Sequence, residues 1–208
     1  MTPERLRDHP RAVALPPLEH QQLVPAVNAY LKQHRGVLYA FIAANVLAVA
    51  AAAYWVAGGS GWDKRLSQAL AGLGVSFFFL VPVHEAIHAI AYRAFGATST
   101  RLHYRWRTLS AYCTADRFAI RGDRFLVVCF APFAVLSCML AAAALWFPVA
   151  APLLGGALVL HTGACSGDFG MAALALAHDP RSFWTWDDVA EARSYFYLLP
   201  PPDGAAAD

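Results

Sequence analysis

Five consecutive residues near the middle of the chain have the types and the spacing of a zinc peptidase site. They read His84-Glu85-Ala86-Ile87-His88, an H-E-x-x-H motif inside an apolar run. Histidines four residues apart on a helix share a face, so both imidazole rings can bind one metal ion. The glutamate between them can hold a metal-bound water and act as a general base. The motif therefore predicts His84 and His88 as zinc ligands and Glu85 as the catalytic residue.

The composition around this motif is that of a membrane protein. Of the 208 residues, 58% are hydrophobic and 14% are charged, whereas ordinary soluble domains carry about 25% charged residues. The net charge is only +2, and no basic block alternates with stacking aromatic residues, so nucleic acid is not an expected partner. The four cysteines form no C-x-x-C pair, so we expect no disulfide framework. Histidine and glutamate are costly at membrane depth and are retained there mainly for function.

Four apolar segments are long enough to cross a hydrocarbon core of about 30 Å. We expect an all-α integral membrane protein with about four transmembrane helices, at residues 37–57, 69–95, 125–147 and 153–177. Asn45 in the first helix is expected to make an interhelical hydrogen bond. Pro82 lies two residues before the motif and predicts a bend, which is either an ordinary membrane-helix kink or an opening of the site to water.

Polar segments flank this predicted membrane domain, which covers residues 36–180. Residues 1–35 form a cytosolic or interfacial N-terminal segment, in which 18–34 is predicted to be a helix against the membrane surface. Residues 181–208 form a cytosolic tail whose Pro-rich end is expected to be disordered.

The longest polar connection, residues 97–124, joins the second and third predicted spans. Residues 101–107 alternate polar and apolar side chains, as a strand does, and 112–120 could pair with them as a β-hairpin. Two interpretations stay open. The connection is a basic loop that holds lipid headgroups, or it offers an edge strand that receives an extended substrate by backbone pairing.

Lys and Arg residues are distributed unequally between the two ends of the predicted spans. With the N-terminus inside, the inside segments hold fourteen of them and the outside segments hold only Lys64 and Arg65. Because positive residues concentrate on the cytoplasmic side of membrane proteins, the sequence predicts an N-in/C-in topology.

A catalytic zinc needs a third protein ligand, and Asp168 is the strongest candidate. It is the only acid besides Glu85 within a predicted span, and its depth from the span end overlaps that of the two histidines. A carboxylate paired with a histidine without metal is the alternative. His161 lies seven residues before Asp168, too far along a continuous helix to bind the same ion, and could orient substrate or stabilise an oxyanion. Cys165 could act as a substitute ligand.

Two segments resemble motifs of the site-2 proteases, which are intramembrane zinc metalloproteases. The run from His84 to Gly96 resembles their H-E-x-x-H helix, in which small and apolar residues and then a glycine follow the motif. Ser166-Gly167-Asp168-Phe169 resembles their later Asp-Gly motif, whose aspartate is the third zinc ligand. The compact four-span layout is more similar still to the zincin peptidase family of bacterial membrane proteins.

The resemblance implies a membrane-embedded zinc metalloprotease with a Zn²⁺ cofactor. Its substrate would be a membrane or membrane-associated protein or peptide, and its location would be the bilayer of the bacterial inner (cytoplasmic) membrane. A catalytically inactive scaffold that binds a partner transmembrane segment is the alternative. A metal transporter with the same ligands ranks last, because the outer halves of the first three spans offer almost no polar residues for an ion path. The oligomeric state is left open.

Overall fold

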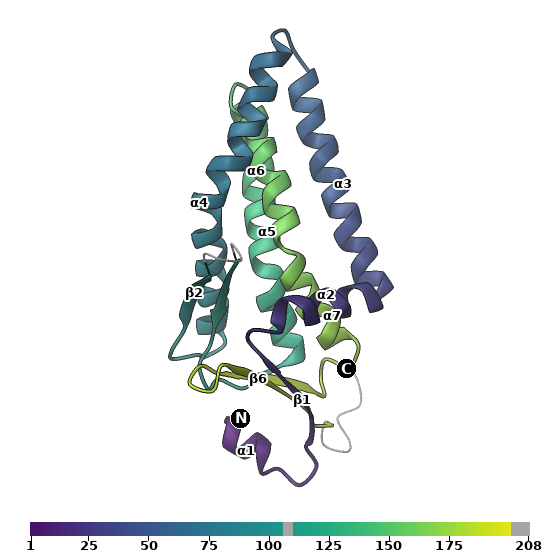
Figure 1. Ribbon diagram of the computed structural model, residues 1–208, viewed down its shortest axis with the longest axis vertical. Helices are drawn as coiled ribbons and strands as arrows, with labels where there is room; N and C mark the ends of the chain where they lie inside the picture. Colours follow the sequence, from purple (N-terminus) through teal and green to yellow (C-terminus); the bar gives the residue numbers. More distant parts are fainter. Residues whose placement is uncertain (106–109, 201–208) are drawn as a thin grey trace.

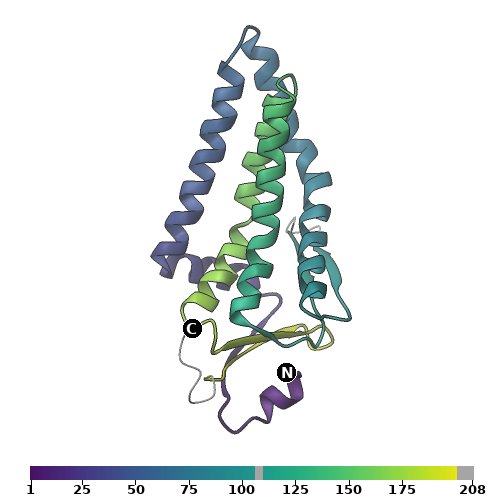
Figure 2. The same cartoon turned by 180° about the vertical axis from the view of Figure 1, so that it is seen from behind.

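The computed structural model describes residues 1–105 and 110–200. Helices dominate the fold and stand side by side as an elongated bundle, with a smaller β-rich part at its lower end (Figure 1, Figure 2). The bundle is formed by α3 (Arg35–Ala57), α4 (Trp62–Ala94), α5 (Gly122–Trp146), α6 (Ala151–Ala164) and α7 (Ser166–Leu176).

Two of these helices, α3 with 23 residues and α5 with 25, are long and apolar enough to cross a membrane. In α4 the parts 62–74 and 76–94 meet at 45°, and together they make a third candidate span. The bend lies between Gly74 and Ser76, about two turns before Pro82, and not at the proline where the sequence predicts one. The helices thus indicate a membrane protein with two or three candidate spans in the described residues.

The fourth expected span, residues 153–177, is not one helix. It is divided at Cys165 into α6 and α7, which have 14 and 11 residues and are each too short to cross a bilayer. Gly163 and Gly167 flank the division, and glycine lowers helix propensity because its backbone loses most freedom on ordering. Four continuous transmembrane helices are therefore not confirmed.

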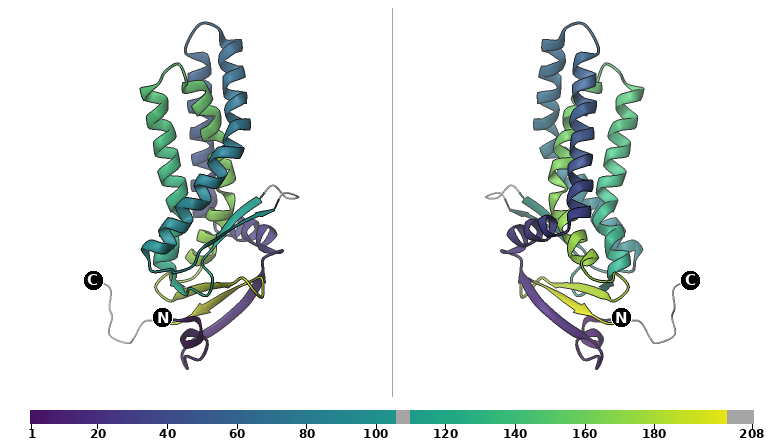
Figure 3. Two further views of the ribbon diagram at one scale, coloured as in Figure 1. Left: turned by 90° about the vertical axis from the view of Figure 1, so that its left-hand side faces the viewer. Right: turned by 90° about the vertical axis from the view of Figure 1, so that its right-hand side faces the viewer.

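The expectation of an all-α protein is wrong, because the chain also forms two β-sheets. An antiparallel four-stranded sheet, in the order β1-β6-β5-β4, lies beneath the bundle (Figure 3). Its strands are β1 (Val13–Glu19), β4 (Ile120–Arg121), β5 (Phe183–Asp188) and β6 (Arg193–Leu198), and a short helix α1 (Pro3–Arg7) precedes β1.

This sheet joins the two ends of the chain, since β1 of the N-terminal segment pairs with β6 of the tail. The tail strands are short runs rich in Phe, Trp, Tyr and Thr, which favour a half-buried sheet surface. The tail up to residue 200 is therefore largely ordered, and the Pro-rich end from residue 201 lies outside the described residues.

The polar connection after α4 contains an antiparallel pair of strands, β2 (Arg101–Arg105) and β3 (Ser110–Thr114). The second strand begins and ends earlier than the predicted 112–120, and Ile120 instead belongs to the four-stranded sheet. Residues 106 and 107, the end of the alternating run, lie outside the described residues. The hairpin extends outward from the lower end of α4 (Figure 3).

Helix α2 (Leu23–Gln33) crosses the lower end of the bundle and packs against α7 (Figure 1). Its backbone approaches closely, because a Cβ added at Gly170 of α7 would lie 2.4 Å from the carbonyl oxygen of Val27. The N-terminal helix thus begins at Leu23, later than the predicted residue 18, and residues 13–19 form a strand instead.

Small residues bring α4 and α6 into backbone contact. A Cβ on Gly72 of α4 would lie 2.0 Å from the carbonyl oxygen of Leu153, and one on Gly156 of α6 would lie 1.9 Å from that of Ala69. Helices that pack on small residues can approach this closely in a membrane. The predicted interhelical bond of Asn45 is confirmed, since Thr162 Oγ1 of α6 donates to Asn45 Oδ1 of α3 at 3.3 Å.

Candidate metal centre

The two histidines of the motif lie one turn apart on the buried face of α4. Their Nε2 atoms are 3.2 Å apart and their rings meet edge to face, with centroids 4.9 Å apart. Both side chains are buried, as is Glu85 between them. The rings therefore direct two nitrogen lone pairs toward one point, which is the arrangement that the four-residue spacing predicts.

Asp168, in the first turn of α7, meets the same point from a different helix. Its Oδ1 lies 3.1 Å from His88 Nε2 and its Oδ2 lies 3.0 Å from His84 Nε2. Two imidazole nitrogens and a carboxylate at such separations form a donor set typical of a zinc site, in which each ligand lies about 2.0–2.2 Å from the ion. The structure thus brings Asp168 to His84 and His88, although it follows His88 by 80 residues in the sequence.

The hydrogen bonding of the Glu85 carboxylate indicates whether a metal-bound water fits this centre. One carboxylate oxygen, Oε2, is buried and has no hydrogen-bond partner among the described residues. The backbone amide of Cys113, on β3, donates a hydrogen bond to the same carboxylate. An unpaired buried oxygen costs free energy, so a polar group beside the ion is required to satisfy it. The residues present fit a hydrated metal ion.

The orientation of His88 is set by a backbone carbonyl on α5. Nδ1 of His88 lies 3.0 Å from the carbonyl oxygen of Val128. That oxygen can only accept, so Nδ1 carries the proton and Nε2 keeps its lone pair for a metal. Pro132 lies four residues after Val128 inside α5 and has no N–H to occupy this carbonyl. The proline therefore leaves the acceptor available to the histidine.

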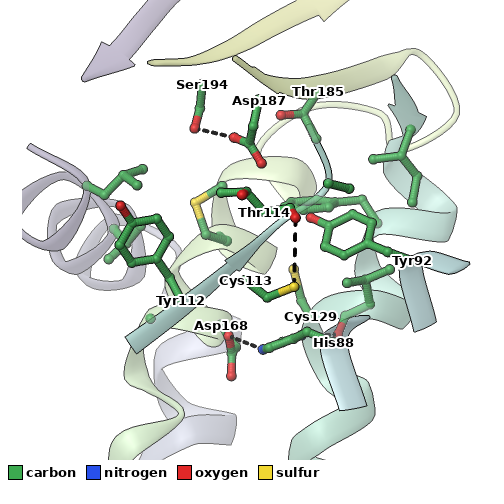
Figure 4. Close-up of a pocket in the computed structure, with 18 of the residues that line it drawn as sticks. His88, Tyr92, Tyr112, Cys113, Thr114, Cys129, Asp168, Thr185, Asp187 and Ser194 are labelled. Carbon is green, nitrogen blue, oxygen red and sulfur yellow. Dashed lines mark hydrogen bonds and ion pairs between the residues drawn. The ribbon is translucent and has the colours of Figure 1, made fainter. Parts of the chain in front are cut away.

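A cavity of about 190 Å³ extends from the centre toward the four-stranded sheet. Figure 4 shows His88 and Asp168 at one end of this cavity and Thr185, Asp187 and Ser194 at the other. Ser194 Oγ donates to Asp187 Oδ1 at 2.6 Å. Cys113 lines the cavity between the two ends, and burial raises the pKa of its thiol to about 12, so the thiol is protonated near neutral pH.

A second cavity, of about 540 Å³, reaches the centre from the side of the bundle. Residues of α2, α4 and α6 line it, most of them apolar, and His84 and Glu85 border it. Both cavities are lined by Glu85 of α4 and by Ala111 of β3. Glu85 therefore borders both the cavity in the apolar interior of the bundle and the cavity that extends toward the sheet.

His161, the candidate for substrate or oxyanion contact, is buried on α6 and faces His84, with ring centroids 5.6 Å apart. It joins a second group of ligand atoms with His84 and Cys165 and is not part of the group that contains Asp168. His161 and Asp168 are not on one continuous helix, because the chain divides at Cys165 into α6 and α7, and this division allows His161 to approach the centre.

Several residues of the site escaped sequence reasoning. The Cys113 amide, the Val128 carbonyl and the far wall at Asp187 belong to elements distant in sequence from the motif. The backbone groups carry no side-chain signal at all. Pro132 was the one sequence signal for the Val128 carbonyl, because a proline inside a helix leaves the carbonyl four residues earlier without its hydrogen-bond donor.

Comparison with known protein families yields a match. The model of a family described as "Putative zincin peptidase" matches residues 77–183, just over half of the chain, including the motif and Asp168. No curated protein and no solved structure matches the chain.

Proposed function

The chain belongs to the zincin peptidase family, and we propose that it is a membrane-embedded zinc metalloprotease that hydrolyses peptide bonds of membrane or membrane-associated proteins. One observation above all supports this. The ligand atoms of His84, His88 and Asp168 converge beside a glutamate whose buried Oε2 has no hydrogen-bond partner in the described part of the chain. Family membership implies zinc, and the two long apolar helices support a membrane location.

In the proposed site His84, His88 and Asp168 hold Zn²⁺. When bound, the ion supplies a Lewis acid that polarises the scissile carbonyl and acidifies a water molecule. Glu85 takes a proton from that water and later donates it to the leaving amine. The amide of Cys113 holds one side of the Glu85 carboxylate and so fixes its direction. His161 lies beside His84 and is proposed to contact the substrate or the developing oxyanion.

The substrate is proposed to pass beside β3 as an extended segment. In the described residues β3 pairs with β2 alone. The Cys113 amide bonds to Glu85, so it points away from β2, and amides alternate in direction along a strand. The backbone of Ala111 therefore faces the same outer edge, where it borders both cavities. A peptide paired there would cross the site from the bundle side to the sheet side.

The charge pattern supports an orientation in which both termini and the hairpin face the cytoplasm of a bacterial inner membrane. Thirteen of the fourteen basic residues belong to described parts of the N-terminal segment, the tail, and the α4–α5 connection with its adjoining helix ends, which lie together at the lower end of the bundle (Figure 1); Arg107 lies outside the described residues. The α3–α4 turn, near Lys64 and Arg65, lies at the opposite end.

Replacing Glu85 by Gln tests the mechanism. The purified protein is expected to contain about one zinc per chain, as a single catalytic site requires, and the Glu85→Gln protein to keep it, because Glu85 is not a ligand. Cleavage should fall by roughly 10²–10⁴-fold, the contribution typical of a general base. Metal content is measured by mass spectrometry, and cleavage is measured as new peptide ends in membranes of cells that express each variant.

Two controls complete this experiment. Asp63→Asn, at the far end of α4, should leave both metal content and cleavage unchanged, whereas His84→Ala should lose both. Undiminished cleavage by Glu85→Gln would refute the proposed mechanism. Zinc-free protein with no cleavage in the wild type would instead favour the inactive scaffold.

A further inference from the structure

A second cluster of metal-ligating side chains lies beside the first and shares His84 with it. His161 and Cys165 are four residues apart at the end of α6, the same spacing as the two histidines of the motif. Cys165 Sγ lies 3.9 Å from His161 Nε2, and the His161 ring meets His84 edge to face. One ligand atom from each of the three residues lies within 4.8 Å of the others.

The packing of α4 on α6 produces this cluster. Gly72 and Gly156 allow the two backbones to touch, and His161 lies five residues, somewhat more than one turn, beyond Gly156. The cluster is buried, with exposed fractions of 8% for His84, 3% for His161 and 0% for Cys165. A buried thiol is common, but two histidines that face each other in an apolar interior are costly unless they are hydrogen-bonded or bind a ligand.

We propose that His84, His161 and Cys165 form a second coordination position for the zinc ion. Two imidazoles and a thiolate are a common zinc donor set, softer than the set that contains Asp168. The 3.9 Å between Cys165 Sγ and His161 Nε2 suits it, because ligands about 2.0–2.3 Å from a tetrahedral ion lie between about 3 and 4 Å from one another. The remaining separations, which are within 4.8 Å, close to this range through small rotations of the side chains. The two positions exclude each other, since His84 offers its one neutral lone pair to either.

Occupation of this position exchanges the ion's bonds to His88 and Asp168 for bonds to His161 and Cys165, while the bond to His84 is retained. The Cys165 thiol now donates to the His161 carbonyl oxygen at 3.2 Å. On binding, this hydrogen bond is lost, a sulfur–metal bond forms, and the thiol proton is released to solvent. Cys165 is the residue at which α6 ends and α7 begins, so a change there requires no break in a continuous helix.

If the chain is the peptidase proposed above, an ion held in this second position would make the enzyme inactive. The regulatory meaning of the second position therefore rests on the proposed function. An ion bound by His84, His161 and Cys165 leaves His88 and Asp168 without metal and lies outside the arrangement that Glu85 serves. One ion would alternate between the two ligand sets, and the peptidase would be active only when the ion is bound by His84, His88 and Asp168.

Cobalt spectroscopy of the full-length protein tests the proposal, because a thiolate bound to Co²⁺ gives a charge-transfer band in the near ultraviolet. Asp168→Ala and His88→Ala each dismantle the first ligand set and leave the second intact. Both are expected to bind about one Co²⁺ per chain and to show this band. Adding Cys165→Ser should abolish the band and weaken cobalt binding by at least about tenfold. Cys138→Ser, on the exposed face of α5, is the matched control and should change neither.

The proposal is overturned if Asp168→Ala and His88→Ala bind no cobalt or bind it without the band, or if the wild type binds two ions at once. Circular dichroism and gel filtration identify a misfolded variant, in which case the other variant decides. The outcome is independent of the proposed function. The band in both variants, together with a metal-loaded Cys165→Ser protein that cleaves nothing, would leave this position standing and refute the peptidase, because that variant cannot hold the ion in the latent position. An active enzyme without the band in either variant would refute only this position.

Discussion

At the scale of single residues, Pro132 contributes to the metal centre without supplying a ligand. It leaves the Val128 carbonyl without a helical partner, and His88 Nδ1 bonds to that carbonyl at 3.0 Å. Partners of this kind fix the tautomer and the direction of a metal-binding histidine, and their loss typically costs 10–100-fold in metal affinity. Because Pro132 has no N–H to bond to the Val128 carbonyl, that carbonyl is free to accept from His88 Nδ1 and so to orient His88.

Replacing Pro132 by Ala should separate stability from metal binding. The variant regains an N–H that competes for the Val128 carbonyl, so the free zinc concentration that gives half-maximal cleavage should rise roughly 10–100-fold. Stability should not fall. Removing a helix-interior proline gains about 3 kcal/mol, which exceeds the roughly 1.6 kcal/mol lost with two buried carbons. Thermal unfolding and zinc titration of cleavage measure the two effects.

The exposed proline of the α5–α6 turn provides the comparison for this experiment. Pro148→Ala should leave the zinc requirement unchanged. If Pro132→Ala binds zinc as the wild type does, the Val128 carbonyl has no part in orienting His88.

At the scale of elements, the close approach of α4 and α6 positions both groups of ligands. The two helices touch through Gly72 and Gly156, and each added Cβ would overlap a backbone carbonyl of the facing helix. Backbone cannot move aside as a flexible side chain can, so a single methyl group would push the helices apart. His84 and His161 are carried on these same helices.

A pair of glycines on α4 makes this claim testable. Gly72→Ala should lower the free energy of unfolding by about 1–3 kcal/mol through overpacking, which lowers the unfolding temperature, and should reduce zinc content. Gly74→Ala should be neutral or stabilise the protein by up to about 1 kcal/mol, since nothing lies within 4 Å of its added Cβ. Thermal unfolding measures the stability of the two purified variants, and metal analysis measures their zinc content. Equal behaviour of the two variants would contradict the packing argument.

At the scale of the whole molecule, the β-sheet gathers the ends of the chain under the helical bundle. β1 comes from the N-terminal segment, β5 and β6 from the tail, and β4 from the connection before α5. The basic segments therefore lie on one end of the bundle, and the α3–α4 turn lies on the other (Figure 1). The proposed orientation places the first end in the cytoplasm.

Single cysteines at the two ends should report this orientation. In spheroplasts of a bacterial expression host, a membrane-impermeant maleimide should label Ser60→Cys before lysis and Ala190→Cys only after lysis. Both positions are exposed. Mass spectrometry of the labelled peptides separates them from the native cysteines. Labelling of Ala190→Cys in intact spheroplasts would reverse the topology.

Features that depend on residues close together in the chain could be predicted before the fold was known. The H-E-x-x-H spacing, the apolar length of α3 and α5, and the glycine after α4 are local patterns with a defined period or length. Gly96 has a φ of +104°, which only glycine adopts easily after a helix. The peptidase family followed from the same local motif, while the ligation of zinc by His84, His88 and Asp168 stays a prediction.

Only the tertiary structure decided which distant groups meet. It divided the fourth predicted span at Cys165, which brings Asp168 to the motif and His161 and Cys165 to the other side of His84. It also paired the two ends of the chain in a sheet, although β1 and β6 lie more than 170 residues apart. Such contacts arise from burial and backbone pairing between elements, and they leave no periodic signal in either segment alone.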